Sequence, residues 1–240
     1  YIICAFIGSI IFITGFSLLV ELIDRTLRDA CRSRRLTGLP VIAAFNGTNN
    51  LKYRGFLKAC NRRAAAYACQ QINGYLQPNR ATIINLLSIE EREGKSFLAK
   101  YFAQYWESEG LHVRIVNHDI DFEKESKSYV QAQQLSDFWQ LNDAEQQPDI
   151  ILVEYPALCH YDVPEKVLAE SDFNLLVANA ARLWSEKDNA RLRSVKDILK
   201  DKSLYLYLNN ADRETVESFT GELPPHNSVH SFFRRLAQLG

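Results

Sequence analysis

The chain has 240 residues, enough for one sizeable domain with an appendage. Its net charge of -1, with 24% charged residues, creates no overall basic field, so we expect no nucleic-acid binding. The cysteines form no CxxC pair and no zinc-type spacing with histidine, which predicts reduced, structural thiols. They are Cys4, Cys31, Cys60, Cys69 and Cys159.

The first twenty residues carry no charge, and this length of apolar helix spans the hydrocarbon core of a bilayer. Residues 1–20 are therefore predicted to form a transmembrane helix. A cleavable signal peptide is the alternative, but it would begin with basic residues and have a shorter apolar run, whereas this run ends at Glu21. Because the chain contains no methionine and begins at Tyr1, we expect it to be a piece of a longer protein, with a processed chain as the alternative.

Residues 21–50 are predicted to be a juxtamembrane helix, over 21–35, and a linker. Arginines crowd this helix, namely Arg25, Arg28, Arg32, Arg34 and Arg35. Positive charge flanking a span is typical of its cytoplasmic side, so residues 21–240 are expected in the cytoplasm. The same arginines suit a solvated helix face or contact with anionic lipid head groups.

Residues 51–240 alternate apolar strands with helices, which predicts an α/β domain with a doubly wound, mostly parallel sheet covered on both faces. We expect a short strand over 40–45, within the preceding segment, and further strands over 81–88, 112–119, 149–156, 172–180 and 203–212. We expect helices over 52–76, 95–109, 128–141, 163–170 and 184–199.

The tripeptide Gly94-Lys95-Ser96 follows a buried strand and opens a helix, as in a phosphate-binding loop. Gly94 would let the backbone approach a phosphate, Lys95 would reach the β and γ phosphates, and the Ser96 hydroxyl would bind Mg²⁺. This pattern predicts a nucleotide site in a fold of the P-loop NTPase type. The alternative is an ordinary helix N-terminus, where acidic residues are favoured by the helix dipole.

The loop departs from the standard pattern in two ways. Ile89 stands where the first glycine belongs, and three carboxylates, those of Glu90, Glu91 and Glu93, precede or flank Gly94. These carboxylates would repel a triphosphate unless they point outward beside Arg92.

Acidic or amide residues follow two of the predicted strands. Asn117 and Asp119 follow the apolar run LHVRIV, and Glu154 follows the apolar run DIILV. A carboxylate at such a strand end can hold Mg²⁺ directly or through water. Together with the loop, these residues predict a metal-nucleotide site.

The order of parts resembles the cytoplasmic end of bacterial tyrosine kinases fused to Wzz-type polysaccharide co-polymerases, the chain-length determinant family. The resemblance rests on the apolar N-terminal run, TGLPVIAAF, EGKS, HVRIVNHDID and PDIILVEYP, and it covers residues 1 to about 212. It implies a bacterial inner-membrane protein whose upstream part holds a first transmembrane helix and an extracytoplasmic domain.

The resemblance also implies roles for individual residues. ATP would be bound by Glu93, Gly94, Lys95, Ser96, Phe97 and Asn209. Catalysis would involve Lys95, Asp119 and Glu154, and Mg²⁺ would be held by Ser96, Asp119 and Glu154. Two positions differ from the family: Asn117 replaces the acid thought to assist the attacking tyrosine hydroxyl, and Glu154 replaces an aspartate.

The expected function is a membrane-anchored, ATP-binding, kinase-like module that regulates capsular or exopolysaccharide polymerisation or export. It would act as a homo-oligomer with the polymerisation and export machinery and would retain at most weak autokinase or ATPase activity. The segment after Pro225 has no tyrosine, so the tyrosine-rich tail of autophosphorylating members is missing. One alternative is an inactive pseudo-kinase scaffold, and another is a membrane-tethered ATPase of the partitioning type.

Overall fold

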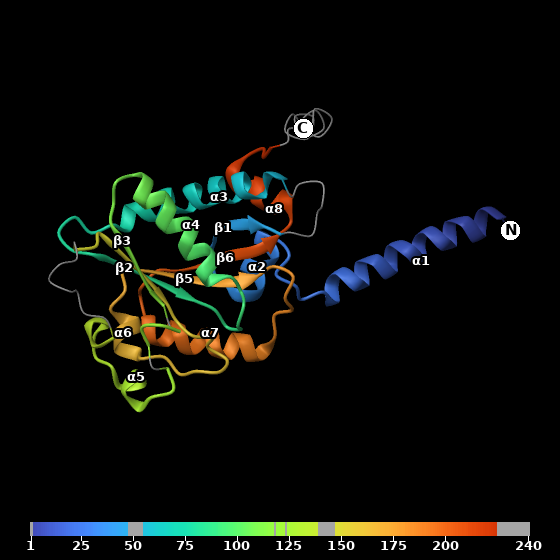
Figure 1. The fold of residues 1–240 in the computed structure, drawn as a ribbon. Coiled ribbons are helices and arrows are strands. Elements are labelled where there is room, and N and C mark those ends of the chain that lie inside the picture. The colour runs from blue at the N-terminus through green and yellow to red at the C-terminus, as the bar shows by residue number, and fades with distance from the viewer. Residues whose placement is uncertain (1, 48–54, 118, 123, 139–146, 225–240) are drawn as a thin grey trace.

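A six-stranded sheet forms the centre of the molecule, shown in Figure 1. The computed structural model describes residues 2–47, 55–117, 119–122, 124–138 and 147–224. The strands are β1 (Val41–Asn46), β2 (Thr82–Leu87), β3 (Val113–Asn117), β4 (Ile150–Glu154), β5 (Phe173–Asn179) and β6 (Leu204–Ala211). Their order is β1-β6-β5-β2-β4-β3, and every neighbouring pair is parallel. The predicted α/β class and the six predicted strands are therefore confirmed.

The central strands are apolar on both sides because helices cover both faces of the sheet. Every residue of β2 and of β4 is buried, and β5 is buried except at Asn179. The register pairs Leu86 of β2 with Glu154 of β4, so the carboxyl ends of these two strands lie at the same level. Ligands of open parallel sheets bind at this edge.

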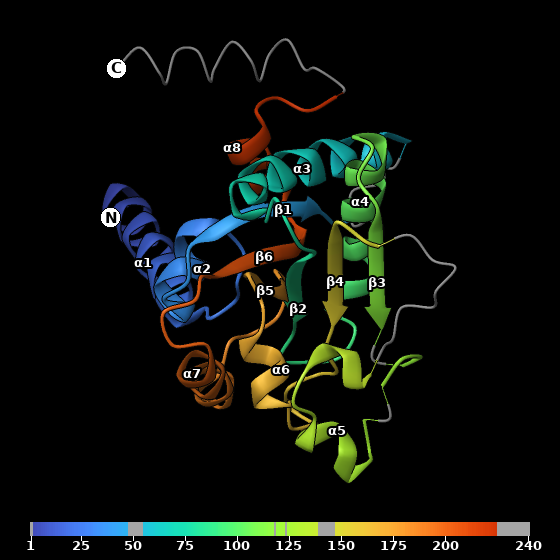
Figure 2. The same cartoon turned by 90° about the vertical axis from the view of Figure 1, so that its left-hand side faces the viewer.

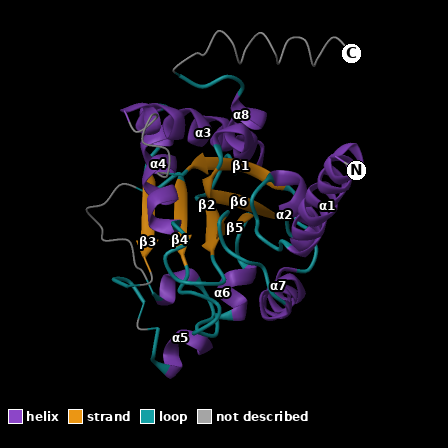
Figure 3. Ribbon diagram, turned by 90° about the vertical axis from the view of Figure 1, so that its right-hand side faces the viewer, coloured by secondary structure: helices purple, strands orange, loops and turns teal. Residues whose placement is uncertain are grey.

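The helices form a layer on each side of the sheet, as Figures 1 and 2 show. One layer contains α3 (Leu57–Ile72), α4 (Lys95–Ser108) and α8 (Arg213–Thr220). The other contains α6 (Glu165–Ala169) and α7 (Glu186–Leu199). The short α5 (Lys127–Gln131) lies near α6, beyond the ends of β3 and β4, in Figure 3.

The N-terminal region contains two helices instead of the continuous run that we expected up to residue 35. α1 (Ile2–Ile23) projects away from the sheet, and α2 (Ala30–Thr37) packs near β1. The break between them arises because Asp29 caps α2, its carboxylate accepting from the Arg32 amide at 2.9 Å. Within the part of the chain that the structure describes, no helix combines the length and apolarity needed to cross a membrane.

The segment between α1 and α2 is hydrogen-bonded to the loop after β5. The Leu27 amide donates to the Arg182 carbonyl at 3.2 Å, and the Trp184 amide donates to the Arg25 carbonyl at 2.9 Å. Thr26 and Leu183 form an antiparallel bridge between these two contacts. The end of α1 is thus tied directly to the carboxyl edge of the sheet.

Two further helical regions differ from the sequence prediction. The helix expected over 128–141 is wrong: α5 ends at Gln131, Ala132 is extended, and a 3₁₀ turn covers Leu135–Asp137. The Asp137 carboxylate accepts from the amides of Gln133 and Gln134, which favours a new turn over a continued helix. Helix α8 was not predicted, because its eight residues give too short a periodic pattern.

Candidate functional site

The loop between β2 and α4 closes tightly around Gly94. Gly94 has φ 101°, a left-handed conformation that side chains rarely adopt. A Cβ at this position would lie 2.1 Å from Nδ2 of Asn209, at the end of β6. The same Asn209 nitrogen donates to the Glu93 carbonyl at 3.0 Å. Asn209 therefore holds the backbone of the loop, and this contact requires glycine at position 94.

Lys95 begins α4 and folds back into the loop. Its side chain is 6% exposed, and Nζ donates to the Ser88 hydroxyl at 2.5 Å. Burial lowers the pKa of Lys95, although the nearby carboxylates of Glu93 and Glu154 oppose this shift. The ammonium group is consequently held inside the loop, where its positive charge would attract a phosphate against the repulsion of the nearby carboxylates.

Ser96 and Glu154 meet directly. The Ser96 hydroxyl donates to Oε2 of Glu154 at 2.5 Å, and Glu154 is only 1% exposed. Burial raises the pKa of Glu154, and the hydrogen bond from Ser96 and the charge of Lys95 partly offset this rise. A hydroxyl and a carboxylate are hard oxygen donors of the kind that Mg²⁺ prefers, so this pair fits a magnesium ion.

The three glutamates of the loop have different surroundings. Glu93 is 2% exposed, and its Oε1 lies 2.7 Å from Nε of Arg182, which follows β5. Oε2 of Glu93 accepts from the Glu90 amide at 3.1 Å. Burial raises the pKa of Glu93, and the guanidinium of Arg182 opposes the rise. Glu90 points to Cys159, and Glu91 is exposed. The expected repulsion is thus reduced, because Glu93 is paired with Arg182.

The segment after β3 is held by short-range contacts. The Asn117 amide donates to Oδ2 of Asp121 at 2.7 Å, and the Asp119 amide donates to Oδ1 of Asn117 at 2.9 Å. The Asp119 side chain is 62% exposed and lies 2.8 Å from Nζ of Lys124. Because Asn117 carries no carboxylate, it cannot accept a proton from an attacking hydroxyl.

A cavity of about 410 Å³ connects these groups. It is lined by Glu91, Arg92, Glu93, Gly94, Lys95, Ser96, Phe97, Asp119, Lys124, Pro156, Ala157 and Tyr161. Two predicted site residues do not line the cavity but contact residues that do. Glu154 accepts a hydrogen bond from Ser96, and Asn209 donates one to the Glu93 carbonyl, next to Gly94. Phe97 packs against Phe45 and Tyr101, with ring centroids 5.4 Å and 4.9 Å away. The predicted residues are therefore brought together around one cavity.

Four residues near the cavity were not predicted. They are Ser88, Lys124, Tyr161 and Arg182. Nζ of Lys124 lies 5.1 Å from the centroid of the Tyr161 ring, so both border the same opening. The position of Arg182 directly after a buried strand places it at the ligand-binding edge, and this was the available sequence signal.

Comparisons with solved structures show the fold that this chain shares. Neither protein-family models nor curated proteins give a match to the sequence. The kinase domain of the Escherichia coli tyrosine kinase ETK superposes with a TM-score of 0.52 at 12% identity, covering 73% of this chain and 92% of that domain. The chimerical protein CapA2B2 gives 0.52 at 14% identity, covering 77% and 100%. The BceF tyrosine kinase domain gives 0.50 at 14%, covering 77% and 98%. The fold is that of bacterial tyrosine kinase domains.

Proposed function

We propose that this chain is a membrane-anchored, kinase-like module that binds ATP with Mg²⁺ and regulates capsular or exopolysaccharide polymerisation or export. The nucleotide part of this proposal rests on one observation. Lys95, Ser96 and Glu154 converge at the N-terminus of α4, beside a cavity of about 410 Å³ at the carboxyl edge of a parallel sheet. This is the place and the chemistry that a nucleoside triphosphate requires.

Each part of the site has a role in this proposal. The amide groups in the first turn of α4 and the Lys95 ammonium hold the phosphates. Ser96 and Glu154 would hold Mg²⁺, which would supply positive charge to offset that of the phosphates. Asp119 also lines the cavity, and its charge is one of those that oppose the lowering of the Lys95 pKa by burial.

The membrane and polysaccharide parts rest on the surface of α1, on the fold and on the sequence motifs. Between residues 6 and 19, the large apolar side chains of α1 are exposed, for example Ile11 at 66% and Phe12 at 73%. Contact with lipid would remove this surface from water. The fold shared with bacterial tyrosine kinase domains and the motifs described above favour assembly as a homo-oligomer with a polysaccharide machinery at the inner membrane.

Binding of ATP tests the nucleotide proposal. We expect the chain, purified in mild detergent, to bind ATP in the presence of Mg²⁺, measured by isothermal titration calorimetry. Lys95→Ala should weaken binding by about 10- to 100-fold, the value of a charge-assisted hydrogen bond of roughly 1.5–3 kcal/mol. Lys100→Ala is the matched control, because Lys100 is exposed on the same helix. Negligible binding by the wild-type chain, or equal binding by the Lys95 and Lys100 variants, contradicts the proposal.

The second candidate is a pseudo-kinase scaffold that acts through assembly alone. Asn117 favours it, since the position has no carboxylate and the adjoining Asp119 is exposed and paired with Lys124. Incubation with labelled ATP separates the two candidates. Transfer of label to tyrosine supports the kinase-like module, whereas ATP binding without transfer or hydrolysis supports the pseudo-kinase scaffold.

A further inference from the structure

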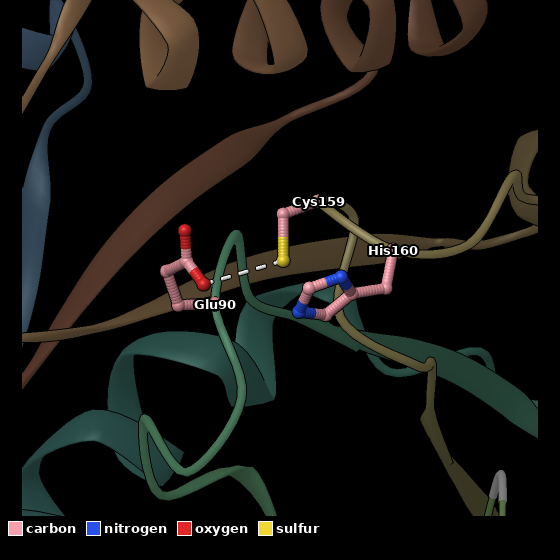
Figure 4. Close-up of side chains that lie close together, drawn as sticks. All are labelled: Glu90, Cys159 and His160. Carbon is pink, nitrogen blue, oxygen red and sulfur yellow. Dashed lines mark hydrogen bonds between the residues drawn. The ribbon is translucent and has the colours of Figure 1, made fainter.

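Three potential metal ligands gather outside the nucleotide cavity. They are the carboxylate of Glu90, the thiol of Cys159 and the imidazole of His160, drawn in Figure 4. One ligand atom from each lies within 4.8 Å of the other two. The Cys159 thiol donates to Oε2 of Glu90 at 3.3 Å, and the His160 ring lies beside this pair.

Backbone hydrogen bonds fix this arrangement. The Leu158 amide donates to the Ser88 carbonyl at 3.0 Å, and the Cys159 amide donates to the Ile89 carbonyl at 2.9 Å. Two loops that follow the neighbouring strands β2 and β4 are thereby joined. The ligand positions therefore depend on the frame of the sheet and not on flexible side chains alone.

We propose that Glu90, Cys159 and His160 bind a divalent transition-metal ion of the zinc type. Thiolate, imidazole and carboxylate are the donors that zinc takes in proteins. With bond lengths of about 2.0–2.3 Å, tetrahedral donors lie roughly 3.5 Å apart. Sγ of Cys159 and Oε2 of Glu90 are already 3.3 Å apart, and the His160 donor atom, within 4.8 Å of both ligand atoms, needs to approach by at most about an ångström, for which its exposed ring has room to turn. Water takes the fourth position.

This site differs from the magnesium site in chemistry and in place. Sulfur and nitrogen donors select zinc-type ions, whereas Mg²⁺ selects oxygen. The cavity is lined from Glu91 onward, so Glu90 lies outside the lining although it belongs to the same loop. On binding, the thiol proton leaves to solvent, the sulfur bonds the metal, and the Glu90 oxygen exchanges its hydrogen bond for a metal bond. The metal would thus join the phosphate-binding loop to the loop after β4.

Cobalt titration tests the proposal, because Co²⁺ replaces zinc and reports a bound thiolate by a near-ultraviolet charge-transfer band. The full chain of 240 residues, stripped of metal in detergent, should develop this band up to one equivalent and lose it when Zn²⁺ is added. Cys159→Ser should abolish the band. His160→Ala, at an exposed position, should weaken Co²⁺ binding at least as much as loss of an outer-shell partner, about 10- to 100-fold.

Matched controls exclude binding elsewhere. Cys31→Ser and His112→Ala alter exposed residues and should leave the band unchanged. Circular dichroism establishes that each variant is folded. Absence of a band in the folded wild type, or a band that survives Cys159→Ser, overturns the proposal. Lys95→Ala should lose ATP binding yet keep the cobalt band, so failure of the metal site and failure of the nucleotide site give different results.

Discussion

The loop between β2 and α4 and the segment after β3 lie at the same edge of the sheet, but their charged groups are held differently. In the loop, Glu93 and Lys95 are almost completely buried, and each has a partner from another part of the fold or from the loop itself. After β3, Asp119 is largely exposed and pairs with Lys124 a few residues away. The groups suited to holding phosphate and magnesium are thus built into the core, and those suited to proton transfer are not.

Among the variants that test this difference, Arg182→Ala should lose the most stability. Removing the guanidinium leaves the buried Glu93 carboxylate without its ion-pair partner, and such a loss costs about 3–5 kcal/mol of unfolding free energy. Urea unfolding measures this change. The double variant Arg182→Ala with Glu93→Gln should recover the part of the stability that is lost at Glu93, because that side chain then carries no charge, whereas Asp188 still lacks its guanidinium partner. A loss below about 1 kcal/mol, the range of an exposed pair, would break the comparison.

Glu154→Gln should remove the magnesium contribution to ATP binding. The amide cannot supply a charged ligand at the place where Ser96 and Glu154 meet, so Mg²⁺-dependent affinity should fall by at least roughly 10-fold. Calorimetry with and without Mg²⁺ measures the effect. Asp119→Asn is the comparison variant from the exposed segment, and a larger loss in that variant would reverse our ranking of the two regions.

Asp188→Asn tests the ion pair between Asp188 and Arg182. Burial acts to raise the pKa of Asp188, but hydrogen bonds from Arg182 and from Ser185 outweigh it, so the pKa lies below the ordinary 3.8. The charged form is stabilised by folding, so the wild type gains stability above pH 3.8, and this gain disappears as the pH falls through the lowered folded value.

We expect Asp188→Asn to lose about 1–2 kcal/mol at neutral pH, since Asp188 also completes the capping box of α7 with Ser185. Urea midpoints of both proteins, measured from neutral to acid pH, should converge at the acid end. A difference that grows on acidification would contradict this assignment. Asp197→Asn, on the same helix, serves as the control.

Lys124→Ala should have the smallest effect. Its ion pair with Asp119 at 2.8 Å is partly solvated, and exposed pairs contribute about 0–1 kcal/mol. Thermal unfolding should show a change within this range. A loss comparable with that of Arg182→Ala would mean that the segment after β3 is as firmly built as the loop between β2 and α4.

The strand pattern was predictable because each strand is a short apolar run bounded by turns, as in residues 81–88 and 172–180. The meeting of Lys95, Ser96 and Glu154 was also predictable, since the motif and the strand end both belong at the carboxyl edge. The prediction of a helix over 128–141 was wrong because hydrogen bonds to the Asp137 carboxylate stabilise a break in the helix. The periodicity of apolar residues does not reveal such contacts.

The other features that could not be predicted depend on contacts between residues that are far apart in the sequence. Arg182 meets Glu93 only because β5 lies beside β2 in the sheet. Cys159 and His160 are adjacent in sequence, but their third companion, Glu90, comes from the loop after another strand. A search for local cysteine and histidine spacing therefore passes over this cluster and interprets the thiol as structural.

The antiparallel bridge between Thr26 and Leu183 has a mechanical consequence. Arg25 and Leu27 are joined by backbone hydrogen bonds to Trp184 and Arg182, and Asp24 pairs with Arg32 of α2, so a load applied along α1 would pass both to α2 and to the loop after β5. Arg182 in turn is bonded to Glu93, one residue before Gly94. These contacts at the sheet edge would therefore offer tension on α1 a path to the loop between β2 and α4 that does not run along the strands.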